Sequence, residues 1–173
     1  MIKKDGNTMI IDTFRDLKSS SAEFNKAKRK TVKLIVKSAE HDQKVIDIIN
    51  TLKEMMDLEW VEIQNPDTKL CSIDGMLYSR NGKNLYFCAR TGAVEIPDGT
   101  KTICEGAACN CMLSELIIPD SVKHIKNFAF FGSCMLEEVK GGSGITDIED
   151  SVFLNCVRLK TVSYTHLTLP TKA

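Results

Sequence analysis

Hydrophobic positions in the second half of the chain recur at a nearly fixed interval. Val94, Leu116 and Val139 stand 22 and 23 residues apart. Three more columns repeat in the same units: Ile103, Ile125 and Ile148; Ala108, Phe130 and Phe153; Leu113, Leu136 and Leu159. A unit of this length cannot bury its own apolar face, so it must stack on its neighbours. The pattern predicts an α/β-type repeat solenoid with a parallel ladder of strands along one side.

Polar and turn-forming residues mark where each predicted strand ends. The apolar stretch 116–118 precedes Pro119, which has no N–H to donate to a ladder and therefore ends the strand. Residues 120–121, Asp-Ser, supply the turn. Val122 then leads into a short return segment. Repeats of this kind are expected over residues 93–161.

These repeats resemble a known family. The segment 118–139, IPDSVKHIKNFAFFGSCMLEEV, is similar to the leucine-rich repeat of the BspA type found in bacterial surface antigens, with the pattern IPxSVxxIxxxAFxxCxxLxxV. Residues 96–116 fit with one residue fewer, and in 144–162 a glycine-rich stretch at 141–144 replaces the Ile-Pro start. The resemblance covers about residues 58–161. It implies a solenoid used for binding.

A hairpin is predicted before the regular repeats. Residues 73–88, IDGMLYSRNGKNLYFC, contain Asn81-Gly82 between two β-prone runs. Asn-Gly flanked by such runs is the strongest short-range hairpin signal. We interpret residues 64–92 as a hairpin insertion between coils.

The N-terminal part has a different periodicity. Apolar residues at helical spacing predict an amphipathic helix over about 42–57, and these are Val45, Ile48, Ile49, Leu52, Met55 and Met56. A strand is expected over 32–36 and another near 58–61. Together they form a strand-helix-strand capping unit at 31–63, since terminal repeats are atypical. Residues 1–30 are interpreted as a polar arm with at most a short docked helix.

The last twelve residues are unlike the rest. Residues 162–171, VSYTHLTLPT, resemble a translated sequencing-library adapter. We interpret 162–173 as an artefact to be excluded from the fold, which makes the chain a fragment of a longer protein. A genuine strand-rich tail is the alternative.

Composition narrows the function classes. The chain has 23 basic and 23 acidic side chains, so it has no net positive charge that would attract nucleic acid or anionic lipid. No apolar run approaches the length of a membrane span. Met1 is not followed by an apolar signal region, which favours the cytoplasm. The cell surface is the alternative, and it would require a misassigned start.

Seven cysteines in a chain without a signal sequence predict reduced thiols rather than a disulfide framework. Cys104, Cys109, Cys111 and His124 suggest zinc, but the paired spacing of a structural zinc site is missing. Core packing is the better interpretation, because Cys156 occupies the repeat position where the pattern has Cys. No metal or cofactor is expected.

Catalytic motifs are also missing from the sequence. It has no glycine-rich phosphate loop, no Ser-His-Asp arrangement and no HExxH. A Cys/His nucleophile would have to use His41 or His124 as its base. We therefore expect no enzymatic activity in this chain, although it could be the non-catalytic part of a larger enzyme.

The leading hypothesis is a protein-interaction or adhesion-type module. Alternating side chains along the ladder place Glu62, Glu95, Ile117 and Lys140 outward, as a row suited to a protein or an extended glycan surface. The alternative is a nucleic-acid-associated protein that uses the basic segment 26–37.

Overall fold

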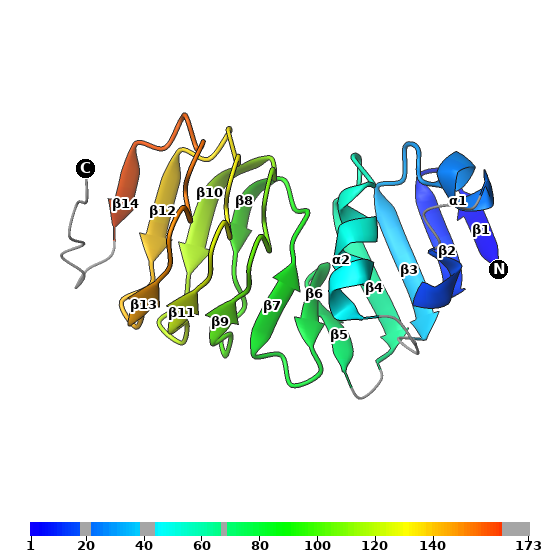
Figure 1. The fold of residues 1–173 in the computed structure, drawn as a ribbon, viewed down its shortest axis with the longest axis horizontal. Coiled ribbons are helices and arrows are strands. Elements are labelled where there is room, and N and C mark those ends of the chain that lie inside the picture. Colours follow the sequence, from blue (N-terminus) through cyan, green and yellow to red (C-terminus); the bar gives the residue numbers. More distant parts are fainter. Residues whose placement is uncertain (18–21, 39–43, 67–68, 164–173) are drawn as a thin grey trace. The chain divides into compact units, whose positions relative to one another are not determined.

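The structure is a computed structural model, which describes residues 1–17, 22–38, 44–66 and 69–163. The chain divides into two compact units, Met1–Arg90 and Thr91–Ala173. Figure 1 shows the order of their elements along the chain. Each unit is described by itself below.

The first unit is built on a four-stranded sheet in the order β1-β2-β3-β4. Its strands are β1 (Ile2–Asp5), β2 (Thr8–Thr13), β3 (Lys33–Ser38) and β4 (Trp60–Asn65). β1 pairs with β2 antiparallel, whereas β2, β3 and β4 are parallel. Parallel neighbours need a crossover, and helices supply it here.

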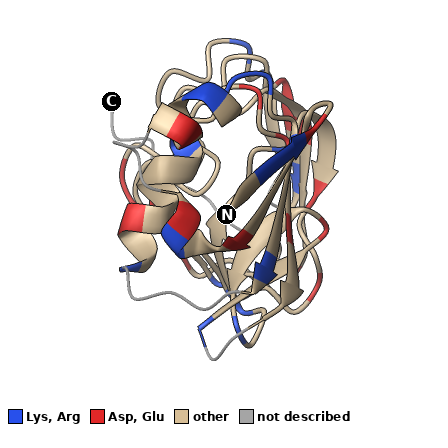
Figure 2. Cartoon of the chain, turned by 90° about the vertical axis from the view of Figure 1, so that its right-hand side faces the viewer, with Lys and Arg blue, Asp and Glu red and all other residues tan. Residues whose placement is uncertain are grey.

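Helices lie along one side of this sheet, as Figure 2 shows. They are the 3-10 turn η1 (Phe14–Asp16), α1 (Ala22–Ala27) and α2 (Val45–Lys53). α2 is shorter than the helix predicted over 42–57, and residues 42–43 lie outside the described part. Its buried residues are Ile48, Ile49, Thr51 and Leu52, one helical stripe against the sheet.

The first thirty residues differ from the predicted polar arm. Their described part contributes two strands, and the fully or almost fully buried side chains are Met9, Ile11, Phe14, Leu17 and Phe24. Met9 and Ile11 pack inward because alternate residues of a strand share one face. This segment is part of the core of the first unit.

Three short strands follow in the same unit. They are β5 (Leu70–Ile73), β6 (Met76–Ser79) and β7 (Asn84–Phe87), paired antiparallel in that order. Asn81 and Gly82 lie in the turn between β6 and β7. The N–H of Val61 on β4 donates to the carbonyl oxygen of Gly75 at 2.9 Å, which ties these strands to the sheet.

The second unit contains the predicted repeats. Its wider sheet consists of β8 (Gly92–Glu95), β10 (Leu113–Ile118), β12 (Glu138–Gly141) and β14 (Thr161–Ser163). Neighbouring strands are parallel, and Leu116 pairs with Val94 on one side and with Val139 on the other. The predicted column is therefore confirmed, and with it the parallel ladder.

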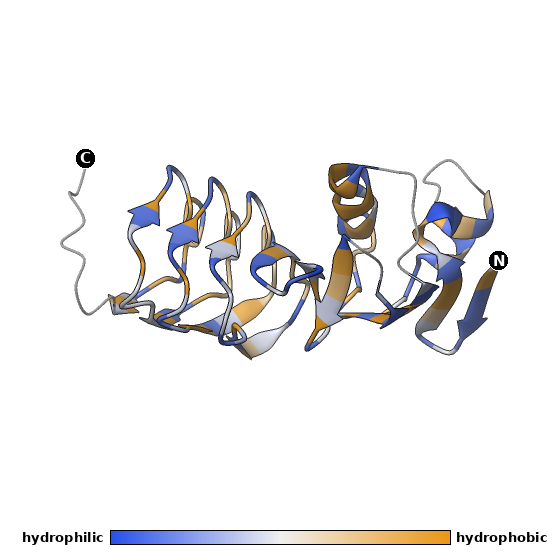
Figure 3. Ribbon diagram, turned by 90° about the horizontal axis from the view of Figure 1, so that it is seen from below, coloured by the Kyte–Doolittle hydropathy of each residue, from blue (hydrophilic) through white to orange (hydrophobic). Residues whose placement is uncertain are grey.

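A narrower parallel ladder runs along another side of each coil. It consists of β9 (Thr102–Ile103), β11 (His124–Ile125) and β13 (Asp147–Ile148), with Ile125 paired to Ile103 and Ile148. Figure 3 shows the coils of this unit stacked one behind the next.

The interior between the two ladders is filled by the repeat columns. Phe130 and Phe153 stack with ring centroids 5.5 Å apart and planes 7° from parallel. Leu116, Ile125 and Leu136 of the middle coil are completely buried. Stacking of identical positions removes apolar surface that a single coil would expose.

Gly141 ends β12 where the other repeats have Ile-Pro. It pairs with Ile118 of the preceding coil and has a φ of +82°. A Cβ atom at this position would collide with the carbonyl oxygen of Ile118. Glycine is therefore required here by both conformation and close approach.

Candidate functional site

The outward side chains of β8, β10, β12 and β14 form two rows, which we call the ladder face. One row contains Ala93, Glu115, Glu138 and Thr161, and the other contains Glu95, Ile117, Lys140 and Ser163. Ser163 falls in the segment 162–173 that was interpreted from the sequence as an artefact, although its first two residues continue the ladder here. None of the eight is buried, whereas Val94, Leu116 and Val139 between them are. Neighbouring coils in such a ladder lie about 4.8 Å apart, so each row is continuous.

Lys140 is the centre of the charges on this face. Its Nζ atom lies 2.8 Å from Oε1 of Glu115 on the neighbouring strand and 3.1 Å from Oε2 of Glu138 on its own strand. The hydrogen bond with Glu115, and then that with Glu138, raises the pKa of Lys140. The three side chains form an ordered, partly exposed network rather than isolated charges.

The structure brings together three of the four predicted face residues. Glu95, Ile117 and Lys140 occupy one register row on three neighbouring strands. Glu62 lies instead on β4 of the first unit, opposite Ile35, and pairs with Lys33 at 2.6 Å. This corrects the prediction that Glu62 begins the row, because β4 pairs with β3 rather than with a repeat strand.

Sequence reasoning missed the second row of the ladder face. Glu115 and Glu138 lie two residues before Ile117 and Lys140 on their strands, and alternation along a strand puts both pairs on one side. The signal was present in the sequence, since the same alternation identified Ile117 and Lys140.

The basic segment 26–37 does not form a surface of uniformly positive charge. Lys28 pairs with Glu54 at 3.0 Å and Lys37 with Asp12 at 2.7 Å, in addition to the Lys33–Glu62 pair. Figure 2 shows that basic and acidic positions, in blue and red, both occur along the ribbon of the chain. Nucleic-acid binding needs a stripe of net positive charge. Pairing with carboxylates weakens that hypothesis.

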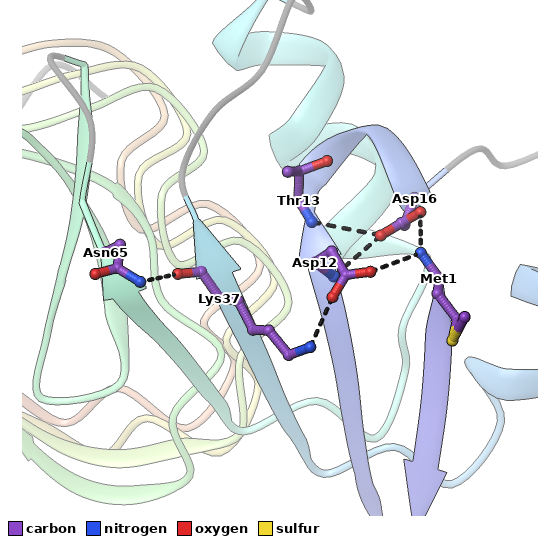
Figure 4. Close-up of polar contacts among 6 residues, drawn as sticks. All are labelled: Met1, Asp12, Thr13, Asp16, Lys37 and Asn65. Atoms are coloured by element: carbon purple, nitrogen blue, oxygen red, sulfur yellow. Dashed lines mark hydrogen bonds and ion pairs between the residues drawn. The ribbon is translucent and has the colours of Figure 1, made fainter.

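A second polar cluster surrounds the end of β2, as Figure 4 shows. The amino group of Met1 lies 2.7 Å from Oδ1 of Asp16 and 3.2 Å from Oδ2 of Asp12. Burial raises the pKa of Asp16, but hydrogen bonds from Met1 and from the N–H groups of Thr13 and Asp12 outweigh it, so the net shift is downward. The cluster balances its own charges and caps η1.

The cysteines behave as packing residues. All seven are free thiols; Cys71, Cys88, Cys111 and Cys156 are buried, Cys104 and Cys109 half-buried, and Cys134 exposed. Burial raises the pKa of Cys104 to about 11, which disfavours the thiolate that a nucleophile or metal ligand needs.

His124, the other candidate residue of this region, lies beside a carboxylate. Its Nδ1 atom is 3.6 Å from Oδ2 of Asp147 on the adjacent coil.

Metal-ligating groups and membrane-spanning helices concern the described ranges alone. No group of three or more His, Cys, Asp or Glu side chains there is arranged to hold a metal ion. Of the helices in these ranges, none combines the length and the hydropathy needed to cross a bilayer.

Comparison with solved structures gives three similar proteins. A leucine rich cell surface protein from Faecalibacterium prausnitzii A2-165 is 25% identical, with a TM-score of 0.57, over 76% of this chain and 38% of that one. A leucine rich repeat protein of T. pallidum is 26% identical, with a TM-score of 0.44, over 47% and 41%. The pneumococcal vaccine antigen PcpA is 17% identical, with a TM-score of 0.38, over 61% and 38%. The chain thus spans about two fifths of their length.

No curated protein matches the chain. The family described as BspA type leucine rich repeat region matches residues 81–170, more than half of the chain. The observed ladders agree with the repeat length of that family. The chain therefore belongs to the BspA-type leucine-rich repeat family.

Proposed function

We propose that this chain is a non-enzymatic binding module that holds a partner protein on its ladder face. The observation that carries the proposal is the register row of Glu95, Ile117 and Lys140 on three parallel strands. Such a row offers one apolar side chain between polar ones on an even surface. A small molecule would instead be expected in a concave, mostly apolar pocket.

The chemistry of the face fits a protein surface or an extended glycan. Ile117 supplies the apolar contact, and Lys140 with its two glutamates supplies charges that are already oriented. Side chains held in place lose little further entropy when a partner binds. Small residues at Ala93 and Thr161 leave room for a partner to approach the strands.

The expected affinity is low. A stable interface buries about 800 Å² on each partner, more than a face of a few coils provides. Binding would then depend on several copies or on further repeats acting together.

We further propose that the protein acts at the bacterial cell surface rather than in the cytoplasm. The similar protein from Faecalibacterium prausnitzii is described as a cell surface protein. Solenoid repeats exposed there would meet proteins and glycans of other cells.

The test compares Ile117→Asp and Lys140→Glu with Val157→Asp, in the full-length protein. Val157 is 81% exposed, so its substitution makes the same aliphatic-to-acid change away from the ladder face. Proteins crosslinked to the wild-type protein on intact cells are quantified for each variant. We expect both ladder-face variants to lose a shared set of partners and V157D to retain it. I117D should keep the wild-type unfolding midpoint, whereas K140E should lower it slightly, because the new carboxylate lies beside those of Glu115 and Glu138.

A further variant separates the two partner classes. Replacing Lys28, Arg29 and Lys30 together by alanine removes positive charge from the basic segment. Loss of partners only in this variant would sink the ladder-face proposal and favour nucleic acid. Loss of partners in V157D alone would indicate that the binding surface lies on another side of the coil.

A further inference from the structure

Asn81 is followed directly by Gly82, and this dipeptide can react without an enzyme. An asparagine followed by glycine is prone to spontaneous deamidation, because a residue without a side chain lets its backbone nitrogen approach the carboxamide carbon. The pair lies in the turn between β6 and β7, with Asn81 exposed to water. No other asparagine of the chain is followed by glycine.

The reaction needs no enzyme or cofactor. The nitrogen of Gly82 loses its proton and bonds to Cγ of Asn81, the Cγ–Nδ2 bond breaks, and nitrogen and proton leave as ammonia. Water then opens the resulting succinimide at one of its two carbonyl carbons. The product is an aspartate or an isoaspartate at position 81.

Hydrogen bonds in the turn oppose both parts of the first step. The N–H of Gly82 donates to the carbonyl oxygen of Ser79 at 2.8 Å, so the attacking nitrogen is engaged. Oδ1 of Asn81 accepts from the hydroxyl of Ser79 at 2.8 Å and from the N–H of Lys83 at 3.1 Å, so the carboxamide is held in place.

Ser79 is itself firmly positioned. The residue is 8% exposed, and its hydroxyl oxygen accepts from the N–H of Asn84 at 3.0 Å. The same residue therefore restrains the nucleophile through its carbonyl group and the electrophile through its hydroxyl group.

We propose that Asn81 is a latent deamidation site and that Ser79 keeps it in the amide form. Cyclisation requires the carboxamide to rotate toward the nitrogen of Gly82, which breaks the hydrogen bonds to Oδ1. Conversion would add a negative charge beside Arg80 and Lys83. Isoaspartate would also lengthen the backbone of the turn and disturb the pairing of Tyr78 with Leu85.

The experiment incubates the full chain at mildly alkaline pH and follows the amide-to-acid mass change by peptide mass spectrometry. We expect conversion at Asn81 to be at least about tenfold slower in the folded chain than in urea. Ser79→Ala removes one hydrogen bond to Oδ1, so conversion should be roughly three- to tenfold faster than in wild type. Ser79→Thr keeps the hydroxyl and should retain the slow rate. Asn84, followed by Leu85, is an internal reference.

Two controls separate protection by the turn from general stability. Leu34→Ala opens a cavity in the sheet of the first unit, where Leu34 is fully buried, without touching the turn. Equal acceleration in L34A and S79A would overturn the role of Ser79. Hydrogen exchange at Gly82 in the wild-type chain needs no variant. A fast-exchanging Gly82, or equal conversion rates in folded and unfolded chains, would overturn the proposal.

Discussion

The thiol of Cys156 donates a hydrogen bond to the carbonyl oxygen of Phe130 on the preceding coil, over 3.1 Å. Ser133 occupies the same repeat position one coil earlier, and its hydroxyl donates to the carbonyl oxygen of Ala108 at 2.9 Å. The position thus accepts Cys or Ser because each is small and carries a donor. Its role is to join one coil to the previous one.

Replacing this donor should cost stability in a graded way. We expect Cys156→Ser to keep nearly wild-type stability and Cys156→Ala to lose roughly 0.5–1 kcal/mol, since the oxygen of Phe130 still accepts from the N–H of Ser133. Urea unfolding of both variants measures the difference. Equal stability of C156A and C156S would show that the thiol contributes only volume.

Glu149 should make the second unit sensitive to acid. Its carboxylate accepts from Nζ of Lys126 at 2.6 Å and from the N–H of Asn127 at 2.9 Å. These hydrogen bonds, that of Lys126 first, lower its pKa below the ordinary 4.5. A lowered pKa stabilises the folded state above the unfolded-state value, and this contribution is lost as the pH falls through the folded pKa.

The matching variant is Glu149→Gln. It should unfold at lower urea than wild type at pH 7, and the gap should close as the pH falls through the lowered folded-state pKa of Glu149, below which both side chains are neutral. Exposed Glu105, changed to Gln, controls for the altered net charge. A gap that persists unchanged into acid would mean that the charge of Glu149 is not what stabilises the coil.

Gly141→Ala should destabilise far more than Gly99→Ala. Both glycines have positive φ, +82° and +91°, so both substitutions carry conformational strain of about 1 kcal/mol. Only at Gly141 does the new Cβ meet a backbone atom, the oxygen of Ile118; at Gly99 nothing lies within 4 Å. We expect G141A to lose at least about 2 kcal/mol. Similar thermal unfolding midpoints for the two variants would contradict the clash.

Thiol labelling should distinguish the cysteines by burial. In the native protein at pH 8, Cys134 should react first, whereas Cys71, Cys88, Cys111 and Cys156 should react only with denaturant. Burial raises the pKa of Cys104 to about 11, so this half-buried thiol should also react slowly. Rapid labelling of most thiols without denaturant would contradict the packed columns.

The repeats of the second unit could be predicted because their signal is local and recurs. Leu116 and Val139 occupy equivalent places in successive units, so finding the period also identifies which residues pair. The same alternation predicts that Ile117 and Lys140 point outward. Glu115 and Glu138 could have been found by extending it one step along each strand.

The first unit was harder to predict because its strands pair over a long distance. Met9 pairs with Leu34, and Leu34 pairs with Val61. No repeated sequence pattern indicates either pairing. Short apolar stretches between polar residues look like a mobile arm until a partner strand satisfies their backbone groups. The outward position of Glu62 could be predicted from alternation, but its sheet could not.

The sequence by itself determined the repeat length, the inward columns and the family, because each coil must bury the same positions against the next. Tertiary structure alone decided which strand lies beside β4, and therefore that Glu62 pairs in register with Ile35 rather than with a repeat strand. It also decided that Lys140 bridges Glu115 and Glu138. Such a bridge depends on side-chain positions across coils, whereas the columns depend only on which residues are apolar.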